Sequence, residues 1–148
     1  MSRKKSFGLT RRERGQSIVE FALGLTVMVV LLSGVVSFGM GLYYYVYMRD
    51  AAQEGAVYGS LNPDDTSGIN QRVRDADGGG GLIYNIYTSG DLGVAVSYSG
   101  SHCEGNGISV TLTYDYPIFM PFIGTLLGSN VISMSASVTD TILTPVCS

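Results

Sequence analysis

The feature that most constrains this chain is an uncharged, apolar run of 28 residues from Phe21 to Met48. A helix needs about 20 apolar residues to cross the hydrocarbon core of a bilayer. The run therefore predicts a transmembrane helix. It is about twice as long as the apolar core of a secretory signal peptide, which has roughly 7–15 residues. We interpret it as an uncleaved anchor or as a segment that is cut on its N-terminal side.

Positive charge is concentrated before this run. Six of the nine Lys and Arg residues lie in the first 14 positions, whereas from Arg49 onward three Arg stand against ten Asp and Glu. The positive-inside rule then predicts a cytoplasmic N-terminus and an outer C-terminal part. A basic N-terminus can also indicate nucleic-acid binding. Here the apolar run that follows directly and the acidic outer part favour orientation and predict no nucleic-acid partner.

The predicted helix begins near Gln16 and continues beyond the membrane, where one of its sides carries small residues at steps of three and four. This small-residue stripe consists of Tyr44, Met48, Ala52, Gly55 and Gly59. A close neighbour on this side is either the protein's own sheet, which is the simpler interpretation, or a second helix, because Gly55 and Gly59 have small-xxx-small spacing. The helix is expected to end at Asn62, since the residue before a proline avoids helical geometry.

A shorter helix is predicted from Thr66 or Ser67 to about Ala76, with the Thr or Ser as its N-terminal cap. Four consecutive glycines, residues 78–81, break the chain after it. A hairpin from Leu82 to Tyr87 is then expected to add an edge strand.

The rest of the chain alternates between apolar and polar residues with a period of two, which predicts antiparallel strands with one apolar face. The three apolar faces are Leu92, Val94, Val96 and Tyr98; Ile108, Val110, Leu112 and Tyr114; and Ile132, Met134, Ala136 and Val138. Such a sheet needs a cover, and the outer half of the long helix is the expected one. The apolar segment Pro117–Asn130 is either a lid over the open end of this sheet or a surface that meets other subunits or the bilayer interface.

The two cysteines, Cys103 and Cys147, both fall in the predicted outer part, where disulfides persist. One intramolecular bridge would close a loop of roughly 45 residues and contribute about 2–4 kcal/mol. The alternative is two free thiols.

No residue pattern predicts catalysis, a cofactor or a metal. His102 is the only histidine, and a metal site needs three or four converging ligands. The run Asp75–Gly78 is similar to the start of a calcium loop, but Gly79 and Ile86 stand where such a loop needs oxygen ligands. Nucleophile-elbow and phosphate-loop motifs are absent. We therefore expect no catalytic, cofactor-binding or metal-binding residues, and a protein that is not an enzyme.

The segment around Gly15 has a specific arrangement: a basic leader, the glycine, four residues, Glu20, an aromatic residue and then the apolar helix. This arrangement resembles type IV pilins and pseudopilins. The sequence GQSIVEFAL at residues 15–23, together with RDAAQEGAVYGS at residues 49–60, resembles more specifically the TadE-like family of the tight-adherence (Tad/Flp) pilus machinery. The resemblance implies that a prepilin peptidase cuts between Gly15 and Gln16, and that Glu20 is the fifth residue of the mature chain. Because major pilins of this subclass are much shorter, it implies a minor pilin or pseudopilin.

Glu20 has two interpretations. In the first, it pairs with the new ammonium of Gln16 on a neighbouring subunit, which relieves the cost of both charges in the membrane and fixes the stagger between subunits. In the second, it lies close enough to the cytoplasmic interface to reach the headgroups.

Together these features predict an α+β, pilin-like fold. Residues 1–15 form a basic cytoplasmic leader, residues 16–48 a transmembrane helix, and residues 49–148 an extracytoplasmic domain with a helix extension at 49–61 and a β-sheet over about 82–142. The expected function is structural, in a Tad-type pilus assembly or secretion apparatus. The expected partners are other pilin or pseudopilin subunits, the prepilin peptidase, the inner-membrane assembly platform and the lipid bilayer. The alternative is an uncleaved single-pass protein whose outer domain binds a ligand or an envelope partner.

Overall fold

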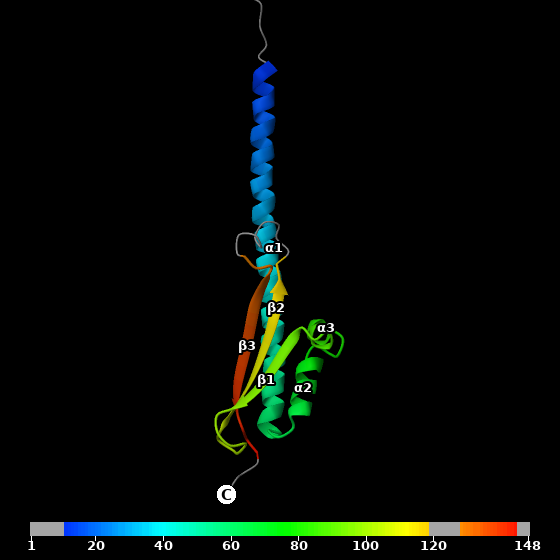
Figure 1. Cartoon of the computed structure of the whole chain (residues 1–148), viewed down its shortest axis with the longest axis vertical. Coiled ribbons are helices and arrows are strands. Elements are labelled where there is room, and N and C mark those ends of the chain that lie inside the picture. The colour runs from blue at the N-terminus through cyan, green and yellow to red at the C-terminus, as the bar shows by residue number, and fades with distance from the viewer. Residues whose placement is uncertain (1–10, 119–127, 145–148) are drawn as a thin grey trace, which may run out of the picture. The chain divides into compact units, whose positions relative to one another are not determined.

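The computed structural model describes residues 11–118 and 128–144, and the chain divides at Val36 into two compact units. The predicted lid or contact surface at 117–130 lies mostly outside the described residues. The predicted boundaries at residues 15 and 48 mark where the chain enters and leaves the membrane. The division into compact units does not test them, so they stay predictions. The long N-terminal helix and the small antiparallel sheet confirm the α+β fold class (Figure 1).

Helix α1 runs from Arg11 to Leu61 and supplies the described part of the first unit. It begins five residues before the predicted start at Gln16, so that prediction is wrong at this end. The reason is that Arg and Glu are good helix formers, and a single Gly15 weakens a helix by about 1 kcal/mol without ending it. At its other end α1 stops before Asn62, as predicted.

The second unit contains a three-stranded antiparallel sheet in the order β1-β2-β3, formed by Leu92–Tyr98, Gly107–Pro117 and Val131–Thr141. Its register places Val96 opposite Val110, and Val110 opposite Val138. Ile108, Val110 and Leu112 are fully buried, while the residues between them are partly exposed. The predicted period of two and its apolar face are therefore confirmed.

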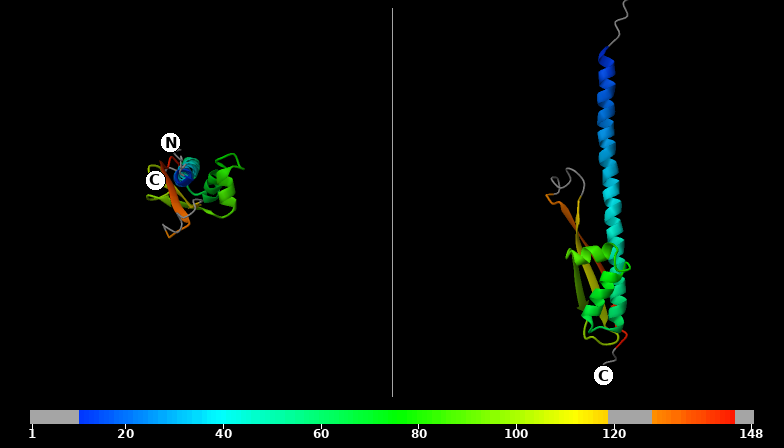
Figure 2. Two further views of the ribbon diagram at one scale, coloured as in Figure 1. Left: turned by 90° about the horizontal axis from the view of Figure 1, so that it is seen from above. Right: turned by 90° about the vertical axis from the view of Figure 1, so that its right-hand side faces the viewer.

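The outer half of α1 covers this apolar face, with α2 beside it (Figure 2). A Cβ atom on Gly55 would lie 2.7 Å from Cγ2 of Val73, and one on Gly59 would lie 2.5 Å from Cδ1 of Ile108. Both distances are too short for real atoms, so only glycine lets the helix come this close. The small-residue stripe thus packs against the protein's own domain, as the simpler interpretation expected.

Helix α2, Thr66–Asp75, buries Ile69 and Val73 against α1. Its N-cap is Asp65, not the predicted Thr66 or Ser67. Asp65 directly precedes Thr66, and its carboxylate oxygen accepts a hydrogen bond from the backbone N–H of Gly68 in the first turn.

The Asp65 carboxylate accepts three hydrogen bonds. They come from the backbone N–H of Gly68 at 2.9 Å, from the Tyr58 hydroxyl at 2.8 Å and from the Ser67 hydroxyl at 2.8 Å. These bonds lower the pKa of Asp65, and the Gly68 bond has the largest effect. The same contact with Asp65 raises the pKa of Tyr58, so α1 and the start of α2 are linked by one hydrogen-bonded pair.

Residues Leu82–Thr88 form helix α3, so the predicted hairpin at 82–87 is wrong and the sheet begins at Leu92 rather than near residue 82. The Asp77 carboxylate accepts a 2.6 Å hydrogen bond from the backbone N–H of Ile83 and thereby supports the first turn. Ile83 and Ile86, three residues apart, are both buried, which is helical spacing rather than strand spacing.

We predict that Gly59→Leu destabilises the second unit. The added side chain has no room beside Ile108 and Ile69, and overpacking of this kind lowers the free energy of unfolding by about 1–3 kcal/mol. The matched control is Val57→Leu, since Val57 lies on the same helix and is about half exposed. The measurement is urea unfolding of the full chain in detergent micelles, followed by near-ultraviolet circular dichroism. Equal midpoints for the two variants would contradict the close approach.

We also predict that acid destabilises this unit partly through Asp65. Because its pKa is lowered by folding, the stabilisation is present above the unfolded-state pKa of about 4 and is lost as the pH falls through the lower folded-state pKa. Asp65→Asn keeps a cap acceptor that does not titrate. Its melting temperature should therefore fall less than that of the unchanged protein when the pH is lowered from about 5 to about 3.

This comparison is made by circular dichroism melts of the full chain in detergent. Some pH dependence should remain in Asp65→Asn, because the hydrogen bond from Arg74 also lowers the pKa of Asp75. An identical loss of stability in both proteins would show that Asp65 does not contribute.

Candidate functional site

Gly15 lies inside α1 without a packing reason to be glycine. A Cβ atom added there meets no heavy atom within 4 Å, in contrast to Gly55 and Gly59. Glycine in a helix interior is unfavourable by roughly 0.5–1 kcal/mol relative to alanine. A residue that breaks a local rule without a structural gain is expected at a functional position. The described structure thus leaves Gly15 free to serve recognition.

Gln16 and Glu20 follow on the same helix, four residues apart, so they lie on one face with a rise of about 6 Å between them. Both side chains are exposed. Glu20 forms no hydrogen bond or ion pair with any other side chain that the structure describes. Within one subunit its carboxylate is therefore available to a partner on another molecule. The structure brings the three predicted residues onto one short stretch of helix and does not test their roles.

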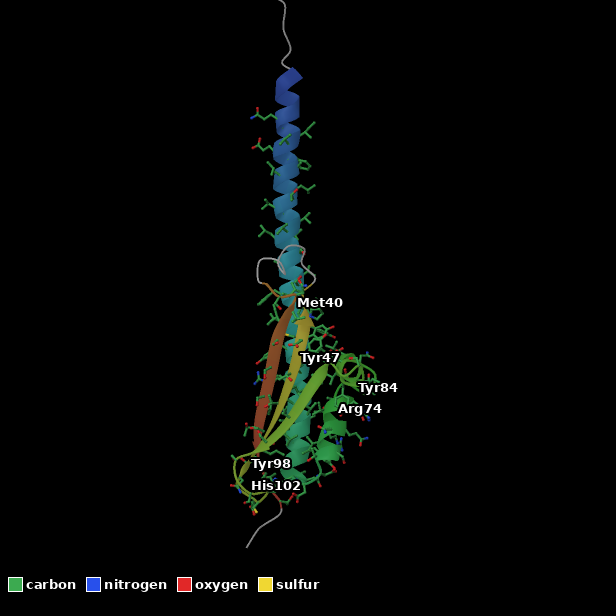
Figure 3. The ribbon with its side chains drawn as sticks, in the orientation of Figure 1. Met40, Tyr47, Arg74, Tyr84, Tyr98 and His102 are labelled. Carbon is green, nitrogen blue, oxygen red and sulfur yellow. The ribbon has the colours of Figure 1, made fainter. Side chains whose placement is uncertain are left out.

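The helix that follows presents large apolar side chains in all directions (Figure 3). Among the described residues, α1 is the one helix that is long and apolar enough to cross a membrane. Its most apolar stretch is not buried against any other part of the described structure. The hydroxyl of Thr26 donates to the carbonyl of Ala22 at 2.8 Å, so this polar group is satisfied within the helix.

A cluster of tyrosines joins α1 to the sheet where the apolar run ends. The ring of Tyr44 stacks on Tyr114 with 5.4 Å between centroids and meets Tyr116 edge-on at 5.2 Å. Burial raises the pKa values of Tyr114 and Tyr116. Sequence reasoning placed Tyr44 on the inward stripe and Tyr114 on the inward strand face. It missed that they meet, because a contact between residues so far apart in the chain has no local signal.

At the other end of the sheet, the β1–β2 turn contacts the α1–α2 connection. His102 Nδ1 lies 2.6 Å from a carboxylate oxygen of Asp64, and its ring centroid is 3.8 Å from that of Tyr98. The hydroxyl of Tyr98 donates to the carbonyl of Pro63 at 2.6 Å, and burial raises the pKa of Tyr98. His102 thus joins the β1–β2 turn to the α1–α2 connection.

Cys103 follows His102, is disulfide-bonded, and no described cysteine is free. The C-terminal segment passes close by, because the backbone N–H of Gly105 donates to the carbonyl of Ile142 at 3.0 Å. Cys147 lies outside the described residues, so the pairing of Cys103 with Cys147 stays a prediction.

The acidic residues of the calcium-like run have structural partners. Asp75 forms an ion pair with Arg74 at 2.7 Å, and Asp77 supports α3. Within the described residues, no group of three or more His, Cys, Asp or Glu side chains converges on a possible metal position. An open groove of about 660 Å³ lies between α1 and α2. Its lining is Asp50, Gln53, Glu54, Val57, Tyr58, Leu61, Arg72 and Ala76.

One known protein family matches the N-terminal part of this chain. The family model described as TadE-like protein matches residues 15–57. Residues 15–57 are a TadE-like segment. The match confirms the resemblance that the sequence suggested, and it covers Gly15, Gln16, Glu20 and the inward-facing Gly55. Neither a curated protein nor a solved structure matches the chain significantly.

The helix that carries the TadE-like segment is, by its length and composition, suited to anchor the chain in a membrane. The match ends at Val57, so it includes the whole apolar run and the inward-facing residues Met48 to Ala56, but not Gly59, where α1 approaches Ile108 of the sheet.

Proposed function

We propose that this protein is a structural minor pilin or pseudopilin of a Tad-type pilus assembly or secretion apparatus, processed by a prepilin peptidase after Gly15. The observation that carries the proposal is the glycine itself. It opens the TadE-like segment, lies before a charge-free apolar helix and has no packing role among the described residues. A peptidase that requires a residue without a side chain before the cleaved bond explains why residue 15 is a glycine.

Cleavage creates the partner that Glu20 lacks. The new ammonium at Gln16 carries a positive charge at the cytoplasmic edge of the membrane. A carboxylate on the neighbouring subunit neutralises it there, and both charges avoid part of their cost in lipid. Since Gln16 and Glu20 are four residues apart on one face, this pairing sets a stagger of the order of one helical turn between subunits. Glu20 then determines register in the same way as a buried polar residue in a coiled coil.

The proposed orientation is a cytoplasmic leader and an extracytoplasmic second unit, as the distribution of Lys and Arg favours. In this position the protein meets the peptidase and the assembly platform of the inner membrane, other pilin or pseudopilin subunits, and the bilayer. The exposed apolar side chains of α1 suit both lipid and the helices of neighbouring subunits.

The second candidate is an uncleaved single-pass protein whose outer domain binds a ligand or an envelope partner. The groove between α1 and α2 is the observation that favours it. This protein would retain its leader and would not sediment with sheared filaments.

For processing, we predict a mature N-terminus at Gln16 and a block of cleavage in Gly15→Ala. The matched control is Gly24→Ala, since Gly24 is equally open on the same helix and should be cleaved normally. The measurement is N-terminal sequencing of protein from membranes that contain the peptidase. A mature chain that starts at Met1 or Ser2 would support the single-pass alternative.

For assembly, we predict that Glu20→Ala is cleaved and inserted normally but is lost from sheared pili or from the assembly complex. The matched control is Glu54→Ala, which removes an exposed carboxylate from the outer half of α1. Both variants are followed by immunoblot of filament and membrane fractions. Normal incorporation of Glu20→Ala would leave only the headgroup interpretation of this residue.

A further inference from the structure

We propose that the membrane-facing end of the sheet is itself a lipid-contact surface that rests in the headgroup layer of the bilayer. We define this surface, the sheet end, by Val131 and Ile132, the exposed first residues of β3, and by Pro117, the partly exposed last residue of β2. The inference rests on the membrane anchor and not on leader cleavage or pilus assembly.

The first step is the depth of α1. Counted from Phe21, about 20 helical residues span the hydrocarbon core and bring the helix to Met40. The apolar run continues for eight more residues, Gly41–Met48, four of which are tyrosines. Tyrosine is enriched where hydrocarbon meets headgroups, because its ring is apolar and its hydroxyl is polar. This stretch therefore lies in the interfacial layer.

The second step is that the sheet is fixed at the same level. Tyr44, in the middle of this stretch, stacks on Tyr114 and contacts Tyr116. Strands β2 and β3 extend from there toward Met40 (Figure 3). Beyond Tyr114, the register pairs Tyr116 with Ile132 and Pro117 with Val131. The sheet end is thus carried to the depth at which the hydrocarbon core stops.

The third step is the chemistry of this surface. Val131 is 44% exposed on the outer face of β3, and Ile132 is 48% exposed on its inward face, where Ala136 further along the strand is buried. The last charged residues on the described sheet before this end are Asp91, which directly precedes β1, and Asp115 in β2. On α1 the first charge after the apolar run is Arg49. Asp115 lies between the two tyrosines that contact Tyr44, and Arg49 lies five residues beyond Tyr44, so the charges of both helix and sheet begin within or beyond the tyrosine layer.

Lipid is the occupant that these observations select. The surface lies beside the part of α1 whose apolar side chains are exposed, and its own exposed residues Val131 and Ile132 are aliphatic and uncharged. Contact with zwitterionic phosphatidylcholine should therefore be sufficient, and salt should have little effect on it. A contact between two copies would instead depend on the ratio of protein to lipid.

The chain contains no tryptophan, so a single introduced tryptophan reports its own surroundings. We choose Val131→Trp for the sheet end and Thr141→Trp as the matched control. Both positions are exposed and lie on the same strand and the same face, separated by about 33 Å. Ile132→Trp is a second probe of the sheet end, in case the first variant does not fold. Each full-length variant is reconstituted in phosphatidylcholine vesicles with and without bromine on the acyl chains near the headgroup.

The expected result is that brominated lipid quenches the tryptophan at 131 or 132 several-fold more than the one at 141, with a blue-shifted emission. The tryptophan at 141 should instead be the one quenched by aqueous acrylamide. Equal accessibility of all positions to acrylamide, without quenching by lipid, would overturn the proposal. So would a blue shift that disappears when the protein is diluted in lipid, because the occupant would then be a second copy. None of these measurements requires cleavage after Gly15, so their failure leaves the proposed function untouched.

Discussion

The packing of α1 against both α2 and the sheet depends on how closely two glycines let the helix approach. Gly55 and Gly59 place helix backbone against the side chains of Val73 and Ile108 at distances that no Cβ atom could share. Because the helix lies this close, Met48 and the small residues Ala51, Ala52 and Ala56 are fully buried. A single sheet with one apolar face must bury that face against another element. Its stability therefore depends on a helix whose inward face is almost flat.

The same helix also has a segment that suits the lipid bilayer. From Ile18 to Tyr43 its large apolar side chains are exposed, which suits lipid or other helices. After Met48 it becomes two-sided, with charges outward and small residues inward. Tyr44 lies at the transition, since it is part of the uncharged run yet contacts Tyr114 and Tyr116. One helix thus connects the membrane and the domain without a loop between them, and the tyrosine contacts fix the level at which the change occurs.

Periodic patterns made much of this fold predictable, and short segments did not. The strands were correct because alternation over seven or more residues is decisive, as for Ile108, Val110 and Leu112. The seven residues of α3 were interpreted as a hairpin because a short apolar run is ambiguous between helix and strand. Asp77 resolves the ambiguity through its hydrogen bond to Ile83, a contact between residues six positions apart. Contacts such as Tyr44 with Tyr114 depend on the assembled sheet, and no local pattern contains them.

For the candidate site, sequence and structure contribute different things. The spacing of Gly15 and Glu20 is visible in the sequence, but a sequence cannot say why a glycine is present. The structure separates the glycines of α1 into two kinds: Gly55 and Gly59 have no room for a side chain, whereas Gly15 and Gly24 are open. Packing within this chain explains the first kind only. The open glycines lie before the sheet-covered part of α1, in a stretch of the helix against which no described residue of the chain packs.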